Sequence, residues 1–151
     1  MAEATLSGWF DAAGRHRFPV RVYYEDTDAG GLVYHANYLR FAERARTEML
    51  RLLGFRHGGL LENAGVSFAV RRAEIDFVAP AKLEDTLEVV TRITDTGGAS
   101  FAVAQIVRRD GRDLARADVH LVTINRAGRP ARLPRPVREV IDDLYKRQKR
   151  D

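Results

Sequence analysis

The chain has 151 residues, of which 45% are hydrophobic and 30% charged, and its formal net charge is +4. This length suits one domain, or a protomer whose core a partner completes, and no apolar run approaches the roughly 20 residues of a membrane-spanning helix. The sequence has no cysteine, which excludes disulfides and thiolate chemistry, and segment 6–10 is too mixed for a signal peptide, so we expect a cytoplasmic protein.

The first element in chain order is a predicted strand that follows an irregular segment. Residues 1–15 have no usable hydrophobic period, and we expect a loose N-terminal arm before a single domain that spans 16–145. From Arg17 onward, apolar and polar residues alternate with the period of a half-buried strand. Tyr24 falls in the apolar phase of this strand, which predicts a core aromatic residue, and Glu25 ends the alternation.

A glycine-bearing loop then leads into a long helix. Apolar residues recur at helical spacing from Tyr38 to Leu53, with charged residues on the opposite face. Asn37 is the predicted N-cap of this helix and Gly54 its predicted C′ residue. The loop therefore delivers Asp28 and His35 to a helix N-terminus, an end that attracts developing negative charge.

Four antiparallel strands are predicted after a connector, 56–65, that has room for one helical turn. Alternating apolar residues place these strands at about 66–77, 87–94, 101–107 and 115–121. The apolar phase changes within the first of them, which predicts a bulge near Arg71–Arg72. Turns are predicted at Gly97–Gly98 and, as a hairpin, at Asp110–Gly111.

The chain ends with a short predicted helix and a basic tail. Pro136 suits the first helical position, and apolar residues from 137 to 145 share one face. The tail, 146–151, reads as a solvated helix end, with an acidic partner or a membrane surface as the alternative. Elsewhere the basic residues are scattered and not grouped with aromatic residues, so the positive charge does not predict a nucleic-acid groove.

These elements predict an α+β fold in which one antiparallel sheet of about five strands buries one long helix. Such a sheet has exposed edge strands, and pairing two protomers along an edge satisfies their backbone groups. We therefore expect at least a homodimer.

Two runs of the sequence resemble a known family. YYEDTDAGGLVYHANYLRFAERARTEML, Tyr23 to Leu50, and more weakly VRRAEIDFVAPAKLEDTLEV, which begins at Val70, resemble the Tol-Pal system-associated acyl-CoA thioesterases. These form a branch of the hot-dog-fold 4-hydroxybenzoyl-CoA thioesterase family. The resemblance implies hydrolysis of acyl-CoA, with acyl carrier protein thioesters as an alternative substrate, and no cofactor or metal. It also implies homodimers or homotetramers with sites at the subunit interface, and a link to lipid metabolism, peripheral to the inner membrane.

The catalytic residues implied by the resemblance are Asp28, His35 and Tyr24. Taken alone, Asp28 in a DTDAGG turn reads as a turn or capping residue, but the second Asp of the family motif is the catalytic carboxylate and falls on this position. It serves as a general base or as a nucleophile, and the sequence leaves both open. Asp26 reads as structural. His35 has no evident packing role, and histidine is the residue type best suited to exchange a proton near neutral pH.

Residues around the helix start are predicted to bind the substrate. Backbone N–H groups near His35 and Ala36 suit a developing oxyanion. Gly31 permits close backbone approach, and Tyr34 and Asn37 are predicted support positions. Five cations are candidates for the phosphates of coenzyme A, without a choice among them: Arg71, Arg72, Lys82, Arg92 and Arg108.

Three other functions are alternatives to this reading. A phosphatase with Asp26 and Asp28 in its nucleophile motif is disfavoured, because position 30 is Gly rather than Thr or Val and no βαβ units follow. A metal site at Asp26, Asp28 and His35 has suitable ligand types but an unspecific spacing. A non-catalytic acyl-CoA or acyl-carrier-protein binder is the main rival, since a fold does not determine a function.

Overall fold

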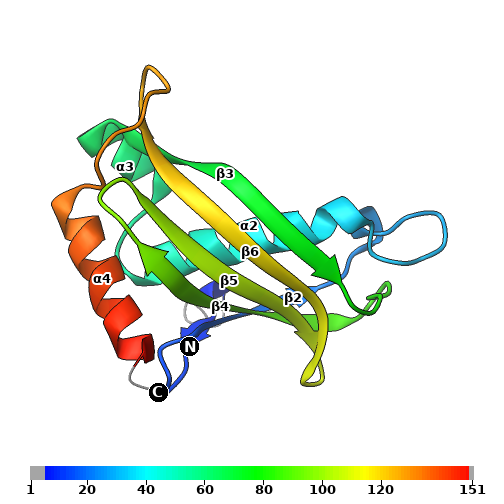
Figure 1. Ribbon diagram of the computed structural model, residues 1–151. Coiled ribbons are helices and arrows are strands. Elements are labelled where there is room, and N and C mark those ends of the chain that lie inside the picture. Colours follow the sequence, from blue (N-terminus) through cyan, green and yellow to red (C-terminus); the bar gives the residue numbers. More distant parts are fainter. Residues whose placement is uncertain (1–5, 150–151) are drawn as a thin grey trace.

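The computed structural model describes residues 6–149. One sheet contains six antiparallel strands in the order β1-β2-β4-β5-β6-β3. The strands are β1 (Trp9–Phe10), β2 (His16–Arg21), β3 (Val66–Phe77), β4 (Thr86–Thr96), β5 (Ser100–Arg109) and β6 (Arg112–Asn125). The helices are η1, a short 3-10 helix (Tyr24–Asp26), α2 (His35–Leu52), α3 (His57–Ala64) and α4 (Arg135–Lys149). This confirms the predicted α+β arrangement (Figure 1).

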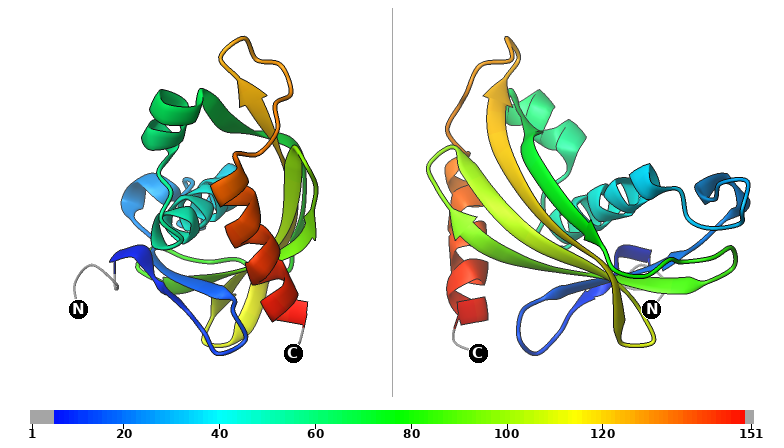
Figure 2. Two further views of the ribbon diagram at one scale, coloured as in Figure 1. Left: turned by 90° about the vertical axis from the view of Figure 1, so that its left-hand side faces the viewer. Right: turned by 45° about the vertical axis from the view of Figure 1, so that its right-hand side comes forward.

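The curved sheet wraps around α2, which lies along its concave side (Figure 2). The face of α2 that meets the sheet is apolar, and Phe41, Ala45 and Met49 on it are fully buried. Gly54, at φ +98°, lies directly after the C-cap residue, as predicted. The helix begins at His35, however, before the predicted start at Tyr38.

The turns and the strand irregularity follow the sequence prediction. The pairing of β3 with β6 shifts register between Val70 and Arg72, which confirms the bulge. Asp110 and Gly111 both have positive φ, 51° and 77°, as a type I′ hairpin turn requires. The connector after α2 contains more helix than one turn, because α3 spans eight residues before Gly65 ends it in the left-handed conformation.

Two clusters of buried side chains make up the core. One surrounds the first half of α2 and includes Val22, Phe41 and Leu87. The other lies between the sheet and α4, which contributes Ile141 and Leu144. Figure 1 shows α4 at one end of the sheet, away from the loop that precedes α2. Lys146, Arg147 and Lys149 form the last turn of α4, so the described part of the predicted basic tail is helical.

The N-terminal segment differs from the predicted loose arm. Residues 1–5 lie outside the described part, but Trp9 and Phe10 pair with Arg17 and His16 as β1. The ring of His16 is fully buried and its Nε2 lies 2.8 Å from the carbonyl oxygen of Ser7. A strand of two residues is too short to show an alternating hydrophobic pattern, so β1 is not evident in the sequence.

Strand β3 ends the sheet on one side. Within the described residues its outer edge has no strand partner. Val70 and Phe77, on the face toward α2, are 50% and 52% exposed. An uncovered edge of twelve residues is long for a natural protein, which normally shields such edges. None of the described helices is both long enough and apolar enough to cross a membrane.

Candidate active site

The loop between η1 and α2 is folded around the side chain of Asp28. Its Oδ1 accepts hydrogen bonds from the N–H of Gly30 at 2.9 Å and from the N–H of Leu32 at 3.2 Å. Gly31 has φ +79°, a conformation that glycine adopts without strain. Among the hydrogen bonds of residues 6–149, none uses Oδ2 of Asp28. This second oxygen is available to water or to a substrate.

Asp26, two residues earlier, has the opposite surroundings. Its side chain is buried, Oδ2 accepts the N–H of Tyr23 at 2.9 Å, and Oδ1 accepts Nδ2 of Asn37 at 2.9 Å. Both oxygens are satisfied inside the protein, which confirms the structural reading of Asp26. The N-cap prediction for Asn37 is wrong, because Tyr34 occupies the cap and the amide of Asn37 is needed by the buried carboxylate.

The surroundings of Asp26 also bear on the metal alternative. Its two oxygens are occupied by Tyr23 and Asn37, so it does not join Asp28 and His35 in a ligand set. Across the described residues, the structure contains no group of three or more His, Asp or Glu side chains placed to hold a metal ion.

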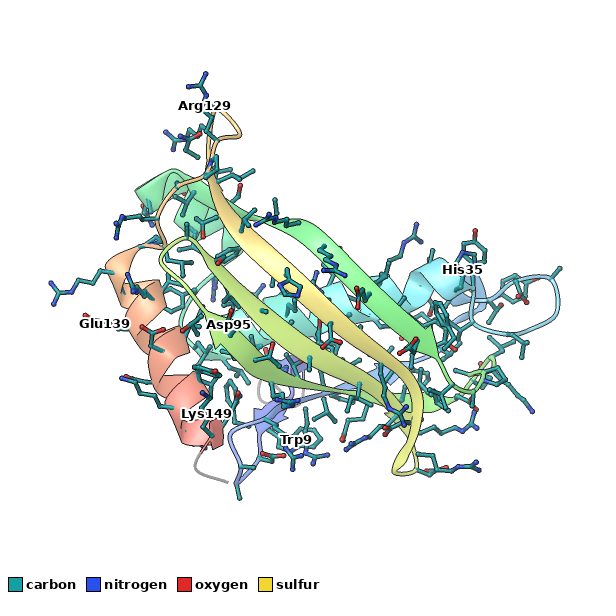
Figure 3. All side chains as sticks on the ribbon, in the orientation of Figure 1. Trp9, His35, Asp95, Arg129, Glu139 and Lys149 are labelled. Carbon is teal, nitrogen blue, oxygen red and sulfur yellow. The ribbon has the colours of Figure 1, made fainter. Side chains whose placement is uncertain are left out.

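His35 is the first residue of α2, and its exposed ring lies among aromatic side chains. The ring centroid is 4.5 Å from that of Tyr34 and 6.3 Å from that of Phe77, which it meets edge-on. Figure 3 places His35 at the end of α2 beside the loop. No hydrogen bond among residues 6–149 uses the N–H of His35 or Ala36, as is usual in a first helical turn. These groups and the helix dipole together favour a bound anion.

A cavity of about 460 Å³ opens beside these groups. Its polar lining includes Asp28, His35 and Tyr34, and the rest is largely apolar: Leu32, Val33, Tyr38, Phe77, Val78, Ala79 and Pro80. A mostly apolar cavity with a few convergent polar groups is the usual form of a small-molecule site. The structure therefore brings three of the predicted residues to one place.

The segment that follows β3 forms the wall opposite the loop. The N–H of Ala81 donates to the hydroxyl of Tyr38 at 3.1 Å, and its carbonyl accepts the N–H of Val33 at 2.9 Å. In the sequence, Tyr38 and Phe77 are recognisable only as members of apolar faces, and their place in the site is not evident. The available signal was an apolar strand end, Phe77 to Ala79, that runs directly into Pro80.

Four predicted site residues do not line this cavity: Tyr24, Gly31, Ala36 and Asn37. Tyr24 is 84% exposed in η1, so the core-aromatic reading is wrong. The reason is that β2 ends at Arg21 and the chain turns away from the sheet before Tyr24. A Cβ on Gly31 meets no atom within 4 Å, so the glycine is required by its φ and not by a close contact within the chain.

An ion pair supports the chain below the cavity wall. Oδ2 of Asp85 accepts Nη1 of Arg109 at 2.7 Å and the N–H of Lys82 at 2.8 Å. Burial alone raises the pKa of Asp85, but the hydrogen bonds from Lys82 and Arg109 outweigh it and hold the pKa below its ordinary value. The carboxylate stays ionised at neutral pH and keeps this turn in place.

The candidate phosphate-binding cations are spread over the molecule. Lys82 adjoins the cavity, because its backbone forms an antiparallel β-bridge with Leu32, which lines the cavity. Arg92 lines a separate crevice beside α4, and Arg108 is paired with Asp113 at 2.9 Å. Of these three, Lys82 alone adjoins the candidate site.

Known proteins resemble the chain over most of its length. A family model described as the thioesterase-like superfamily matches residues 22–142. The acyl-CoA thioesterase YbgC of Haemophilus influenzae is 44% identical over 128 residues, which cover 84% of this chain and 94% of that protein. The acyl-CoA thioester hydrolase YbgC of Escherichia coli O6:H1 is 46% identical over 123 residues, covering 80% and 91%.

A solved structure agrees with these sequences. The crystal structure of a probable thioesterase from Bartonella henselae matches with a TM-score of 0.77 and 41% sequence identity, covering 80% of this chain and 99% of that one. Its fold and its name point in the same direction as the two sequence relatives.

Proposed function

The chain belongs to the thioesterase-like superfamily, with a hot-dog fold, and is an acyl-CoA thioesterase; from this premise we propose that it cleaves its substrate at the start of α2. Asp28 is the catalytic carboxylate, and the cavity beside it holds the acyl thioester. The observation that carries this assignment is the Oδ2 atom of Asp28, which no hydrogen bond among residues 6–149 occupies, at a cavity that adjoins a helix N-terminus.

Thioester hydrolysis needs a nucleophile at the carbonyl carbon and a partner for the oxygen that becomes negative. As a general base, Asp28 takes a proton from water while the water oxygen bonds to that carbon. The C–S bond then breaks, and the departing thiolate takes up a proton. As a nucleophile, Asp28 bonds to the carbonyl carbon directly, the C–S bond breaks, and the departing thiolate takes up a proton. Water then cleaves the resulting anhydride and restores the carboxylate. Both routes require the ionised carboxylate.

The first turn of α2 polarises the carbonyl in this proposal. The N–H groups of His35 and Ala36 have no acceptor among the described residues and point along the helix axis toward its N-terminal end. One such donor is worth roughly 10²–10³ in rate. Ala36 therefore binds the substrate through its backbone N–H group, and its side chain does not need to line the cavity.

The imidazole of His35 has an auxiliary role. Its edge-on contact with Phe77 and its contact with Tyr34 hold the ring at the mouth of the cavity. From there it orients the attacking water or the thioester carbonyl. Tyr24, exposed on the far side of η1, is left out of the chemistry.

A homodimer completes the fold in this proposal. The outer edge of β3 has no partner within residues 6–149, and two of its side chains toward α2, Val70 and Phe77, are half-exposed. Pairing with β3 of a second copy satisfies the edge and covers Val70 and Phe77. Light scattering at micromolar concentration tests this, since a monomer mass contradicts it. A tetramer of two such dimers is the larger alternative.

Substrate delivery and location are proposed more coarsely. Acyl carrier protein thioesters carry the same reacting group as acyl-CoA and are the alternative substrate. The basic last turn of α4, with Lys146, Arg147 and Lys149, suits a cytoplasmic enzyme that touches the anionic surface of the inner membrane. Vesicle co-sedimentation with and without anionic lipid tests the membrane contact.

Two variants of one motif test the catalytic assignment. Asp28→Asn keeps the shape of the side chain but is neither a useful base nor a nucleophile, so kcat falls at least ~10²-fold while the melting temperature changes little. Asp26→Asn is the matched control, because it alters a buried carboxylate that the chemistry does not use. We expect it to lower stability and to leave kcat per folded enzyme nearly unchanged.

The readouts are thiol release from acyl-CoA and a melting curve for each variant. Activity of Asp28→Asn equal to that of the unaltered enzyme contradicts the assignment. So does a loss of activity in Asp26→Asn that exceeds its loss of folded protein.

A further inference from the structure

A second cavity lies farther along α2, between this helix, α3 and β3. It measures about 170 Å³, and its walls are mainly apolar, with Leu50, Phe68 and Phe101 among them. Four side chains with polar ends also line it: Glu43, Arg46 and Thr47 from α2, and His57 from α3, whose Nε2 lies 2.9 Å from the hydroxyl oxygen of Thr47. For comparison, an apolar cavity of roughly 150 Å³ binds benzene. The space therefore suits one ring or a short chain.

Arg46 is the unusual residue of this cavity. Only 9% of it is exposed, and Nη1 donates a hydrogen bond to Oε1 of Gln105 at 2.9 Å. Among residues 6–149 this is the only hydrogen bond of a guanidinium that has five N–H groups. Burial lowers its pKa, against the opposing charge of Glu43. The Nε and Nη2 atoms of Arg46 are not among the fully buried nitrogens that lack a partner in the described residues, so their N–H groups stay accessible and suit an acceptor on a ligand in the cavity.

Glu43 supplies the complementary group. It lines the same cavity, yet forms no ion pair within 4.0 Å with Arg46 among the described residues. A donor and an acceptor that face one space without meeting each other suit a hydroxyl group, which accepts from a guanidinium and donates to a carboxylate. A carboxylate ligand would instead face the charge of Glu43.

Within one chain this cavity is far from the catalytic end. Eleven residues separate His35 from Arg46, which is ~16 Å along a helix that rises 1.5 Å per residue. In the proposed dimer the second cavity of one subunit lies beside the catalytic end of the other, because the bulge in β3 determines which residues of the two strands face each other.

On the two sides of the bulge, different residues of β3 face α2: even-numbered residues before the bulge and odd-numbered residues after it. Before the bulge, Val66 and Phe68 pair with inward residues of β6, and after it Ile75 and Phe77 do so. Directly opposed residues of an antiparallel pair point to the same face of the sheet. In a pair of β3 strands, an even-numbered inner residue from before the bulge must therefore face an odd-numbered inner residue from after it, and their two numbers add to an odd value. When all twelve residues of both strands pair, Val66 lies opposite the partner's Phe77, and these two residue numbers add to the odd value 143.

This register brings the two cavities together. The partner's Phe77, which belongs to the catalytic cavity and touches His35 in each chain, lies ~5 Å from Val66 and ~7–8 Å diagonally from Phe68. Phe68 belongs to the second cavity. A substrate at one subunit's Asp28 thus reaches the other subunit's Arg46 with a compact acyl group.

We propose that the second cavity receives the far end of the acyl group from the partner's catalytic site, where Arg46 and Glu43 select acyl groups with a hydroxyl remote from the thioester. This rests on the proposed function, because it takes Asp28 as the reacting end. Arg46 is a specificity-determining residue that acts across the subunit interface.

The test compares two thioesters, 6-hydroxyhexanoyl-CoA and hexanoyl-CoA, by their ratio of kcat/KM. A ratio does not depend on the fraction of enzyme that is folded, so it stays valid for a destabilised variant. A hydrogen bond to a charged group predicts a preference for the hydroxyl of roughly tenfold to a hundredfold. Arg46→Met abolishes this preference, whereas Arg44→Met, an exposed neighbour on the same helix, retains it.

Mixed dimers test the action across the interface. A dimer of one Asp28→Asn chain and one Arg46→Met chain contains one site with both Asp28 and Arg46 if Arg46 serves the partner. Its only active site then shows the full hydroxyl preference. If Arg46 serves its own chain, the only active site has Met at this position and shows no preference.

Each outcome decides the proposal. A ratio of one or below in the unaltered enzyme overturns it, and so does a preference that survives Arg46→Met or is absent from the mixed dimer. The proposed function fails by a different result, namely full turnover by Asp28→Asn, which leaves the substrate ratio and its dependence on Arg46 unaffected.

Discussion

The two ends of α2 contain similar apolar side chains but are covered differently. At the far end, α4 places Val137, Ile141 and Leu144 against the core, and all three are buried. At the His35 end, Phe77 and Val78 are 52% and 50% exposed. Figure 1 shows α4 at the first end, whereas the second has only the short helix η1 and loops.

This difference separates stability from function. Apolar surface left in water forfeits ~25 cal/mol per Å², so a fold keeps such surface exposed only where something else covers it. The covered end has no catalytic group in our proposal. The open end combines exposed aromatic rings with Asp28 and a helix N-terminus, and in the proposed antiparallel dimer each open end lies against the start of the partner's β3.

Truncation at the covered end is the strongest way to break this comparison. Ile141 is fully buried, so Ile141→Ala removes buried carbon atoms and leaves a cavity. We expect the free energy of unfolding to fall by about 2–5 kcal/mol, measured by urea unfolding at fixed protein concentration. Thiol release per folded enzyme should stay within twofold.

Val140→Ala on the same helix is the control, because Val140 is only half-buried. It should cost less than Ile141→Ala. A fall in turnover that exceeds the loss of folded protein would show that the covered end also contributes to catalysis.

The opposite change is made at the open end. His35→Ala removes an exposed ring, so stability should change little, while kcat falls by tens to a few hundredfold as an orienting group is lost. The dimer should persist in light scattering. His120→Ala, on the exposed outer face of β6, is the matched control and should behave like the unaltered enzyme. If both variants were as active as the unaltered enzyme, the N–H groups at the start of α2 would polarise the thioester carbonyl without help from the His35 side chain.

The regular elements of the fold were largely predictable from the sequence. The bulge after Val70 and the hairpin at Asp110–Gly111 are local consequences of alternation and of positive φ, and both were confirmed. The long helix was confirmed for the same reason, since an apolar stripe has a period that can be read directly.

The site was predictable only in part. Asp28, His35 and Tyr34 line one cavity, but Phe77 comes from a strand more than forty residues later, and a one-dimensional pattern does not contain that meeting. Tyr24 and Asn37 were misread because strand and cap rules ignore competition. The buried Asp26 claims the amide of Asn37, and the chain leaves the sheet before Tyr24.

A smaller effect, on the pH dependence of stability, is expected from His16, a buried residue of β2. Nε2 of its ring lies 2.8 Å from the carbonyl oxygen of Ser7, so Nε2 carries the proton, and the buried Nδ1 has no partner among the described residues. Burial lowers the pKa of His16 below its ordinary value of 6.5, against smaller raising effects of the Ser7 carbonyl and of Glu48. The imidazole is therefore neutral in the folded chain over a range of pH in which the unfolded chain takes up a proton.

The sign of the pH dependence follows from this difference. Below pH 6.5 the unfolded state binds more protons than the folded state, so stability is complete above pH 6.5 and is lost as the pH falls toward the lowered pKa of the folded chain. One group contributes at most about 1.4 kcal/mol per pH unit. His16→Phe keeps a ring against Phe10 and Phe18 but cannot titrate, so its melting temperature should fall less between pH 7 and pH 5 than that of the unaltered enzyme. Activity at pH 7 should be unchanged, because His16 does not line the catalytic cavity. Parallel melting-temperature curves for the two proteins would mean that the ring is already protonated, or solvated, in the folded state.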